Sequence, residues 1–388
     1  MEFSTRQADQ VPTTPAEQPH QDSRPSDKAE PFAGLVPHEH LHRTVLAANE
    51  RAPEELRGQF LVLTHRGPDP DALGACEGIR CLLTTGYGMQ VTVATLGQIH
   101  RAENLAMVRH LELELEDFEG IDAKQYAGVL LVDTQPEFGH TVVPEDCELI
   151  ALFDHHVPPN DPDQEPRQVE HRDVRLNQGA TCSIVYEYLR EAKVPIDTKT
   201  AGALFCGIRY DTADLSRNSG DLDEEAYHAT FHLANRELIA EINNPPLPRH
   251  YYVELAGALT IARQHGPLVL ALMGKVDNPE SVAEMADFFL RMKGCSWVLA
   301  GAAFGDDYIL SLRTDYAFGK AYPLMSRVLD GAGSFGGHGH IAGGRIKLDD
   351  DKESTIRSAE RMLRASALEV IGAELEDGIP PEGRLLTE

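Results

Sequence analysis

Hydrophobic and polar positions alternate along the first two thirds of the chain in a way that predicts strands and helices in turn. Short apolar runs, typical of buried strands, are followed by longer segments whose apolar residues recur every three or four positions, typical of helices. This alternation predicts an α/β fold with a parallel sheet and helices on both of its faces. The expected strands cover residues 59–64, 90–95, 127–132 and 148–153, and the expected helices cover 71–84, 179–192, 198–208 and 224–241.

Closely spaced prolines between Asn243 and Pro248 interrupt this pattern and predict a linker, because proline is tolerated neither inside a helix nor in an inner strand. Beyond the linker we expect a helix at 250–264, a strand at 267–273, a helix at 280–292, a hairpin from 296–299 to 308–312, and a last helix at 352–372. The predicted organisation is a disordered tail at 1–37, a first domain at 38–242, a linker at 243–250, a smaller α/β domain at 251–372 and a tail at 373–388.

Acidic residues and histidines gather where four of the apolar elements end. The carboxyl ends of parallel strands meet at one edge of a sheet, so residues that follow these strands are expected to form one site. Packing alone gives no reason for this placement, although a single Asp such as Asp71 could simply cap the next helix. The residues concerned are His65, Asp69, Asp71, Asp133, Asp154, His155, His156 and Asp211.

The donor set of this site predicts divalent metal ions. Carboxylate oxygens and imidazole nitrogens without thiolates point to Mn²⁺, Mg²⁺, Fe²⁺ or Co²⁺ more than to structural zinc. Six ligands are too many for one catalytic ion with an open position, but they suit two ions roughly 3.5–4 Å apart that share a carboxylate. Such a pair can activate water and neutralise a phosphoryl group under in-line attack.

Composition narrows the function further. The net charge of −27 argues against a clamp for long DNA, which needs a basic stripe, but it allows a small anionic substrate. No apolar run reaches the roughly 20 residues that span a bilayer. The six cysteines form no Cys-x-x-Cys pair, which favours reduced thiols in a cytoplasmic protein. The partners we expect are short nucleotides and no membrane, and the oligomeric state stays open, a homodimer included.

The motifs resemble those of the DHH family of phosphoesterases, over about residues 40–350. The first four motifs of that family are similar to His65-x-x-Pro68-Asp69-x-Asp71, Val132-Asp133-Thr134, Asp154-His155-His156 and Asp211-Thr212. The stretch from Asn177 to Ser183 is similar to the Gly-Ala-Thr-Ser segment that follows the third motif. Ser311-Leu312-Arg313 and Gly336-Gly337-His338 resemble the DHH-associated C-terminal domain of nanoRNA/pAp phosphoesterases and RecJ-type exonucleases.

This resemblance implies a role for each residue. Two Mn²⁺ ions are the expected cofactors. One would be held by His65, Asp69 and Asp133, and the other by Asp71, Asp133, His155 and Asp211, with Asp133 as the bridge. The catalytic residues would be Asp133, His156, which would face the scissile phosphate, and Asp154, which would orient the histidines. The substrate would be bound from the second domain by Arg313, Gly336, Gly337 and His338.

The expected activity is two-metal hydrolysis of short oligoribonucleotides, linear dinucleotides or pAp. Three departures from the family pattern, at Ala75, at Ala213 with Leu215, and at Gly339, remove no metal ligand but bear on the substrate. One alternative is a pyrophosphatase or exopolyphosphatase, although the basic Ser-Arg-Lys-Lys-Gln-type motif of those relatives is absent. The other alternative is a non-catalytic nucleotide sensor, which the full set of six ligands disfavours. The glycine-rich stretch 331–344 could also be a surface loop.

Overall fold

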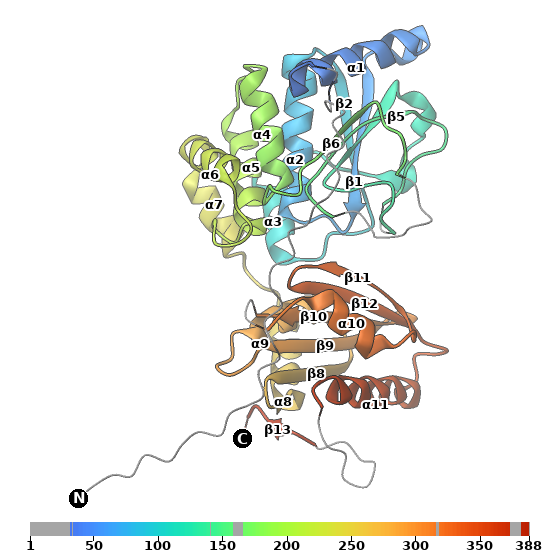
Figure 1. Cartoon of the computed structure of the whole chain (residues 1–388), viewed down its shortest axis with the longest axis vertical. Coiled ribbons are helices and arrows are strands. Elements are labelled where there is room, and N and C mark those ends of the chain that lie inside the picture. The colour runs from blue at the N-terminus through green and yellow to red at the C-terminus, as the bar shows by residue number, and fades with distance from the viewer. Residues whose placement is uncertain are drawn as a thin grey trace, which may run out of the picture.

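The computed structural model describes residues 32, 34–139, 141–157, 166–315, 318–372 and 382–387, without the side chain of His338. The expected N-terminal tail therefore lies mostly outside the described residues, as does much of the expected C-terminal tail. Two sheets, each with its own helices, make up the described part of the chain (Figure 1). No helix in this part combines the length and apolar character needed to cross a bilayer.

The first sheet has six parallel strands in the order β3-β2-β1-β4-β5-β6. Its central strands are buried along their whole length, as the continuous apolar runs of the sequence predict. This sheet confirms the predicted parallel α/β domain. The strands are β1 (Gln59–Arg66), β2 (Gln90–Leu96), β3 (Glu116–Asp117), β4 (Gly128–Val132), β5 (Leu149–Asp154) and β6 (His171–Val174).

The α-helices expected on both faces of the first sheet lie on one face, and 3-10 helices with loop residues cover the other. The expectation fails because the described segments before and after β4 form 3-10 helices and loops instead of α-helices. Helix α2 (Pro70–Cys81) lies between the sheet and an outer layer of helices, so eleven of its twelve residues are buried. The helices are α1 (Pro37–Arg51), α2 (Pro70–Cys81), α3 (Ala102–His110), α4 (Thr181–Glu191), α5 (Thr198–Asp211), α6 (Asp221–Leu233) and α7 (Arg236–Asn243), with the short η1 (Glu54–Leu56), η2 (Leu82–Gly86), η3 (Phe118–Gly120) and η4 (Ala123–Gln125).

The second sheet is mixed, with seven strands in the order β11-β12-β10-β9-β8-β7-β13. Helices α8 (Arg249–Ile261) and α9 (Glu280–Leu290) cover one face, and α10 (Ala321–Leu329) and α11 (Glu353–Val370) cover the other. This arrangement confirms a second α/β domain. The strands are β7 (Arg263–His265), β8 (Leu268–Lys275), β9 (Trp297–Phe304), β10 (Asp307–Thr314), β11 (Ser334–His338), β12 (Ile341–Lys347) and β13 (Arg384–Leu385).

Several local predictions were wrong. The helix expected at 224–241 is two helices, because Asn235 caps a new helix by accepting hydrogen bonds from Glu237 N and Leu238 N. For the glycine-rich stretch, the alternative of a surface loop is excluded, because β11 and β12 pair there as a hairpin. Residues 384–385, expected to be frayed, pair with β7. Helices α3 and α10 and the short strands β3, β6 and β7 were not predicted.

The close packing of α5 on α2 depends on glycine. A β-carbon on Gly207 would lie 2.4 Å from Cys182 Sγ and 2.9 Å from Asp71 Cα. We predict that Gly207→Ala lowers the free energy of unfolding by about 1–3 kcal/mol through overpacking, and that it weakens metal binding by displacing Asp71. Urea denaturation measures the first effect.

The matched control for this substitution is Gly257→Ala in α8. A β-carbon on Gly257 meets no atom within 4 Å, so this change should raise stability by about 0.5–1 kcal/mol. Equal effects of the two substitutions would contradict the packing constraint at Gly207.

Candidate metal centre

The candidate site lies where the chain changes direction across the first sheet. From β1 the chain builds outward through β2 and β3, then returns to β4 on the other side of β1. The carboxyl ends of β1 and β4 therefore flank the switch point at which open α/β sheets bind their ligands. His65 stands at the end of β1, and Asp133 directly follows β4. In Figure 1, this edge of the sheet is turned toward the second domain.

Asp133 is the centre of the cluster. It is 1% exposed and takes a left-handed backbone conformation, with a φ of 58°, which Asp tolerates better than most residues. One carboxylate oxygen, Oδ2, lies 3.6 Å from His65 Nε2, and the other, Oδ1, lies 3.7 Å from His155 Nε2. Its two oxygens thus face different histidines, as a bridging carboxylate would require.

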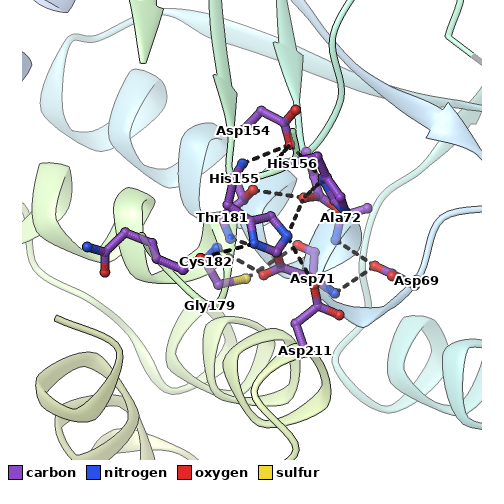
Figure 2. A network of polar contacts seen from close by, with 12 residues as sticks. Asp69, Asp71, Ala72, Asp154, His155, His156, Gly179, Thr181, Cys182 and Asp211 are labelled. Atoms are coloured by element: carbon purple, nitrogen blue, oxygen red, sulfur yellow. Dashed lines mark hydrogen bonds and ion pairs between the residues drawn. The ribbon is translucent and has the colours of Figure 1, made fainter. Parts of the chain in front are cut away.

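Two carboxylates enter the site through helix N-termini (Figure 2). Asp69 is the N-cap of α2 and accepts hydrogen bonds of 3.0 Å from Asp71 N and Ala72 N. Asp71 therefore does not cap its own helix. It is fully buried and accepts hydrogen bonds from the first amides of α4, at 2.7 Å from Thr181 N and 2.9 Å from Cys182 N. These amides offset part of the cost of burying the Asp71 charge.

The end of β5 positions two histidines differently. His155 Nε2 lies 3.1 Å from Asp211 Oδ2 and 3.8 Å from Asp71 Oδ2, inside the cluster. His156 Nδ1 donates to Asp154 Oδ1 at 2.8 Å. Asp154 is fully buried and also accepts from the backbone amides of both histidines. The roles assigned to these residues remain predictions, but Asp154 is placed to orient the His156 ring. The ring of His155 is instead held at Nδ1, which lies 3.3 Å from the Gln178 carbonyl.

Asp211 reaches the cluster from the last position of α5. The helix ends there in a left-handed turn of three non-glycine residues, Ala213, Asp214 and Leu215, with φ values of 46°, 55° and 63°. Arg217 holds this end in place, because its Nε and Nη2 donate to the Asp211 carbonyl at 2.9 and 2.7 Å. This role of Arg217 was not predicted.

Buried like charges dominate the electrostatics of the site. Burial raises the pKa of Asp71 well above its ordinary value, and the carboxylates of Asp133 and Asp211 add to this rise. Burial with Asp211 and Asp133 raises the pKa of Asp69 to about 6. Burial would also raise the pKa of Asp133, but His65 and the other two histidines outweigh it and lower that pKa. Burial opposes protonation of His65, yet Asp133 and Asp69 raise its pKa to about 9.

The described side chains fit two metal ions. Three groups of three residues bring one ligand atom each to within 4.8 Å of one another: His65 with Asp69 and Asp133, Asp71 with His155 and Asp211, and Asp133 with His155 and His156. Asp133 Oδ2 and His155 Nε2 are buried and, within the described part of the chain, have no hydrogen-bond partner. All six predicted ligands therefore come together. The third group adds His156, which the sequence interpretation had placed outside the ligand set.

Two further residues of the site were missed by the sequence analysis. Thr181 Oγ1 donates to Asp133 Oδ1 at 2.8 Å, although only its membership of a motif was noted. Gln135 Nε2 donates to Asp154 Oδ2 at 2.6 Å and to the His156 carbonyl at 2.9 Å. Gln135 could have been predicted as a site residue, because it follows Asp133 by two positions and so lies near the same edge of the sheet.

The predicted substrate-binding residues of the second domain are spread over two places. Arg313, on β10, donates to Asp287 Oδ1 of α9 at 2.6 Å. Gly336 and Gly337 lie in β11, the edge strand nearest the first domain in Figure 1. A β-carbon on Gly337 would collide with Ile341 O, whereas one on Gly336 would meet open space. The side chain of His338 lies outside the described residues. Both glycines are exposed, but only Gly336 has open space where a β-carbon would be.

A cavity of about 350 Å³ separates the two domains beside the cluster. Its lining includes Pro70, which stands between two candidate ligands, and Tyr210, which precedes a third. Arg101, at the start of α3, donates from Nη2 to Asp287 Oδ2 at 3.1 Å and from Nη1 to the Tyr210 hydroxyl. Asp287 therefore links an arginine of each domain. Three arginines (Arg101, Arg209 and Arg291) and three acidic residues (Glu103, Glu284 and Asp287) line the cavity.

Comparison with known proteins identifies the family. The profile described as "DHH family, N-terminal domain" matches residues 59–208. An uncharacterized protein from Methanocaldococcus jannaschii is 31% identical over 335 residues, which cover 84% of this chain and 67% of that protein. The chain belongs to the DHH family. The predicted phosphoesterase family is confirmed, and the His/Asp cluster is its metal centre.

Two further proteins similar to this DHH protein have names that refer to pyrophosphate or polyphosphate. A probable manganese-dependent inorganic pyrophosphatase from Streptococcus pyogenes is 25% identical over 197 residues, which cover 48% of this chain and 57% of that protein. The crystal structure of an exopolyphosphatase-related protein from Bacteroides fragilis superposes with a TM-score of 0.65 at 14% identity, covering 86% of this chain and 98% of that one. The superposition on the Bacteroides fragilis protein shows that the two proteins share a fold across both domains.

The two histidines should differ in their effects. His155→Ala should lower both metal content and turnover, since its Nε2 faces three carboxylates. His156→Ala should lower turnover more than metal content, because Asp154 holds its Nδ1. Metal analysis of both purified variants, with turnover measured alongside, checks the division. Equal metal loss would place His156 among the ligands, as the third group of side chains allows.

Metal binding should release protons. Without metal the pKa of His65 is about 9, so its ring is protonated at pH 7.5, and a metal ion requires the neutral form. The pKa of His155 is also raised, which adds to the release, so at least one proton should leave at pH 7.5. Affinity should rise with pH up to about 9 and fall further below pH 6, where Asp69 gains a proton. Calorimetric titration in buffers of different ionisation enthalpy measures the protons released; a binding enthalpy independent of buffer would contradict this.

Proposed function

We propose that this DHH protein hydrolyses phosphoester bonds in short oligoribonucleotides, linear dinucleotides or pAp, using two Mn²⁺ ions. The observation that carries the proposal is the sharing of Asp133 between groups of ligand atoms that approach from opposite sides. Two sets of donors around one buried carboxylate fit phosphoryl transfer, in which the attacking and leaving oxygens both need stabilisation.

The bound ions would supply a hydroxide and neutralise the phosphoryl oxygens. The side chains of the protein would position the ligand atoms and donate a hydrogen bond or a proton. Asp71, fixed by the amides of α4, and Asp133, fixed by Thr181, would keep the ligand atoms in place during turnover. His156 is the most exposed of the three histidines, at 21%, and Asp154 raises its pKa against the effect of burial. It would therefore donate a hydrogen bond or a proton to the phosphoryl or leaving oxygen.

Substrate choice would lie with the second domain. The cavity between the domains is large enough for a ligand of mononucleotide size. Its arginines would contact the phosphate, and its acidic residues would accept hydrogen bonds from hydroxyl or amino groups of the ligand. Arg313 is 11% exposed and already paired, so a phosphate would have to compete with Asp287 or draw it aside. The open backbone at Gly336 supports close approach of a phosphate or base on the side facing the metal centre.

A second candidate is hydrolysis of pyrophosphate or polyphosphate. It is favoured by the names of two relatives, a probable pyrophosphatase and an exopolyphosphatase-related protein. Both reactions break a P–O bond and can use the same metal centre, so the difference must come from groups that contact the rest of the substrate. The sequence lacks the basic motif that such relatives carry beyond the linker.

One panel under Mn²⁺ separates the two candidates. We predict that pAp, pApA or a five-nucleotide RNA is cleaved at least ten-fold faster, in kcat/KM, than pyrophosphate or tripolyphosphate. Asp133→Asn should abolish every activity while circular dichroism stays unchanged, since the variant loses the shared charge but keeps its shape. Preferential cleavage of the inorganic substrates would establish the second candidate, and no turnover on either class would support a nucleotide sensor.

A further inference from the structure

A second cavity, of about 390 Å³, lies on the side of the second domain away from the metal centre. It is bounded by α11 on one side and by β7 and β8 on the other. Strand β7 lies next to last in the sheet, at the opposite edge from β11, and Figure 1 places α11 and β13 at the far end of the molecule. No step proposed for the metal centre involves this region.

Arginines line this cavity because of the periodicity of two elements. Along α11, Arg357, Arg361 and Arg364 recur at helical spacing and face the same side. Along β7, Arg263 and His265 are two residues apart and so point to one face of the sheet. Four arginines thus converge in a chain whose net charge is −27. This local reversal of charge needs an explanation.

Among the described residues, the acidic groups near Arg357 and Arg263 neutralise these two side chains only weakly. Arg357 pairs with Glu353, but both side chains are at least 70% exposed, so the pair contributes little. Arg263 lies 4.0 Å from Glu382, which is 84% exposed. Glu360 lines the cavity, but its Oε1 already accepts hydrogen bonds from Gly274 N and the Tyr308 hydroxyl. The arrangement keeps several positive charges close together.

His265 supplies an independent sign of a ligand. It is 7% exposed and lines the cavity, and among the described residues its Nε2 has no hydrogen-bond partner. A buried polar atom without a partner costs about 1–3 kcal/mol. Burial lowers the pKa of His265 to about 4, with Arg364 and Arg263 adding to the effect, which reflects the positive potential around the ring. An anion bound here would give His265 Nε2 a hydrogen-bond partner and would balance the positive potential around the ring.

We propose that this cavity binds a small phosphate-bearing metabolite, at a site separate from the metal centre. The arginines would bind the phosphate, since guanidinium groups match phosphate oxygens in pairs. The apolar wall of Ile261, Leu270 and Leu272 would contact the remaining part of the ligand, and the volume suits a mononucleotide. This site is independent of the proposed reaction, because none of its residues belongs to the metal cluster.

Equilibrium dialysis with the Mn²⁺-loaded full chain tests the proposal. Inorganic phosphate, pyrophosphate and AMP serve as probes, so that a site for the inorganic ions can be told from one for nucleotides. We expect the wild-type chain and the Asp133→Asn variant to bind a probe at the same class of site, because the proposed site does not include Asp133. Arg361→Gln and Arg263→Gln should weaken that class roughly ten-fold, as loss of a charged hydrogen bond would. Turnover of Arg361→Gln should be unchanged.

The matched control is Arg327→Gln, an exposed arginine on α10 of the same domain. It should bind all three probes like the wild-type chain. Arg361 is itself exposed, so loss of folding is not expected to obscure its result. The proposal is overturned if no probe binds Asp133→Asn, or if the three arginine variants bind alike. If Asp133→Asn loses turnover but still binds a probe, the arginine site and the metal centre are shown to act independently. The two proposals can then fail or succeed separately.

Discussion

Burial of several carboxylates at one edge of a sheet is the constraint on which this structure depends. Asp71 and Asp133 are almost inaccessible to water, and Asp69 and Asp211 lie beside them. Such a cluster repels itself unless amides, imidazoles or cations compensate. The fold supplies the amides by directing the N-termini of α2 and α4 at the cluster. Metal ions would supply the remaining positive charge, so stability and metal binding are expected to be coupled in this protein.

The same arrangement explains why the helices are packed so tightly behind the site. Asp71 can reach the first amides of α4 only if α2 lies close to both α4 and α5. Glycine at 74 and 207 permits this approach, because a β-carbon at either position would collide with a neighbouring helix. The metal centre is therefore built by helix packing as much as by strand ends. The link between the domains is slighter. It includes the contact of Arg101 with one oxygen of Asp287, whose other oxygen accepts from Arg313 of its own domain.

The sequence was sufficient to predict the four central strands of the first sheet and the gathering of the ligands at its edge. Both follow from a local rule, since apolar runs form strands and residues after parallel strands share an edge. What it could not predict depends on contacts between distant segments. The capping of α4 by Asp71 joins residues 110 positions apart, and the pairing of Arg313 with Asp287 depends on how α9 lies across β10. The glycine-rich hairpin was ambiguous because glycine indicates a turn and a close-packed strand equally well.

The remaining surprises in the first domain lie where the backbone is strained. Asp133 and the turn from Ala213 to Leu215 adopt left-handed conformations without glycine, and each such residue costs on the order of 1 kcal/mol or more. Asp133 itself is a predicted ligand, and the turn begins two residues after Asp211. A left-handed residue after β4 changes the course of the chain at the sheet edge, where the Asp133 carboxylate lies among His65, His155 and Thr181. Sequence propensity predicts against such conformations, and the surrounding hydrogen bonds hold them in place. We infer that this strain is retained because the position of the two carboxylates requires it.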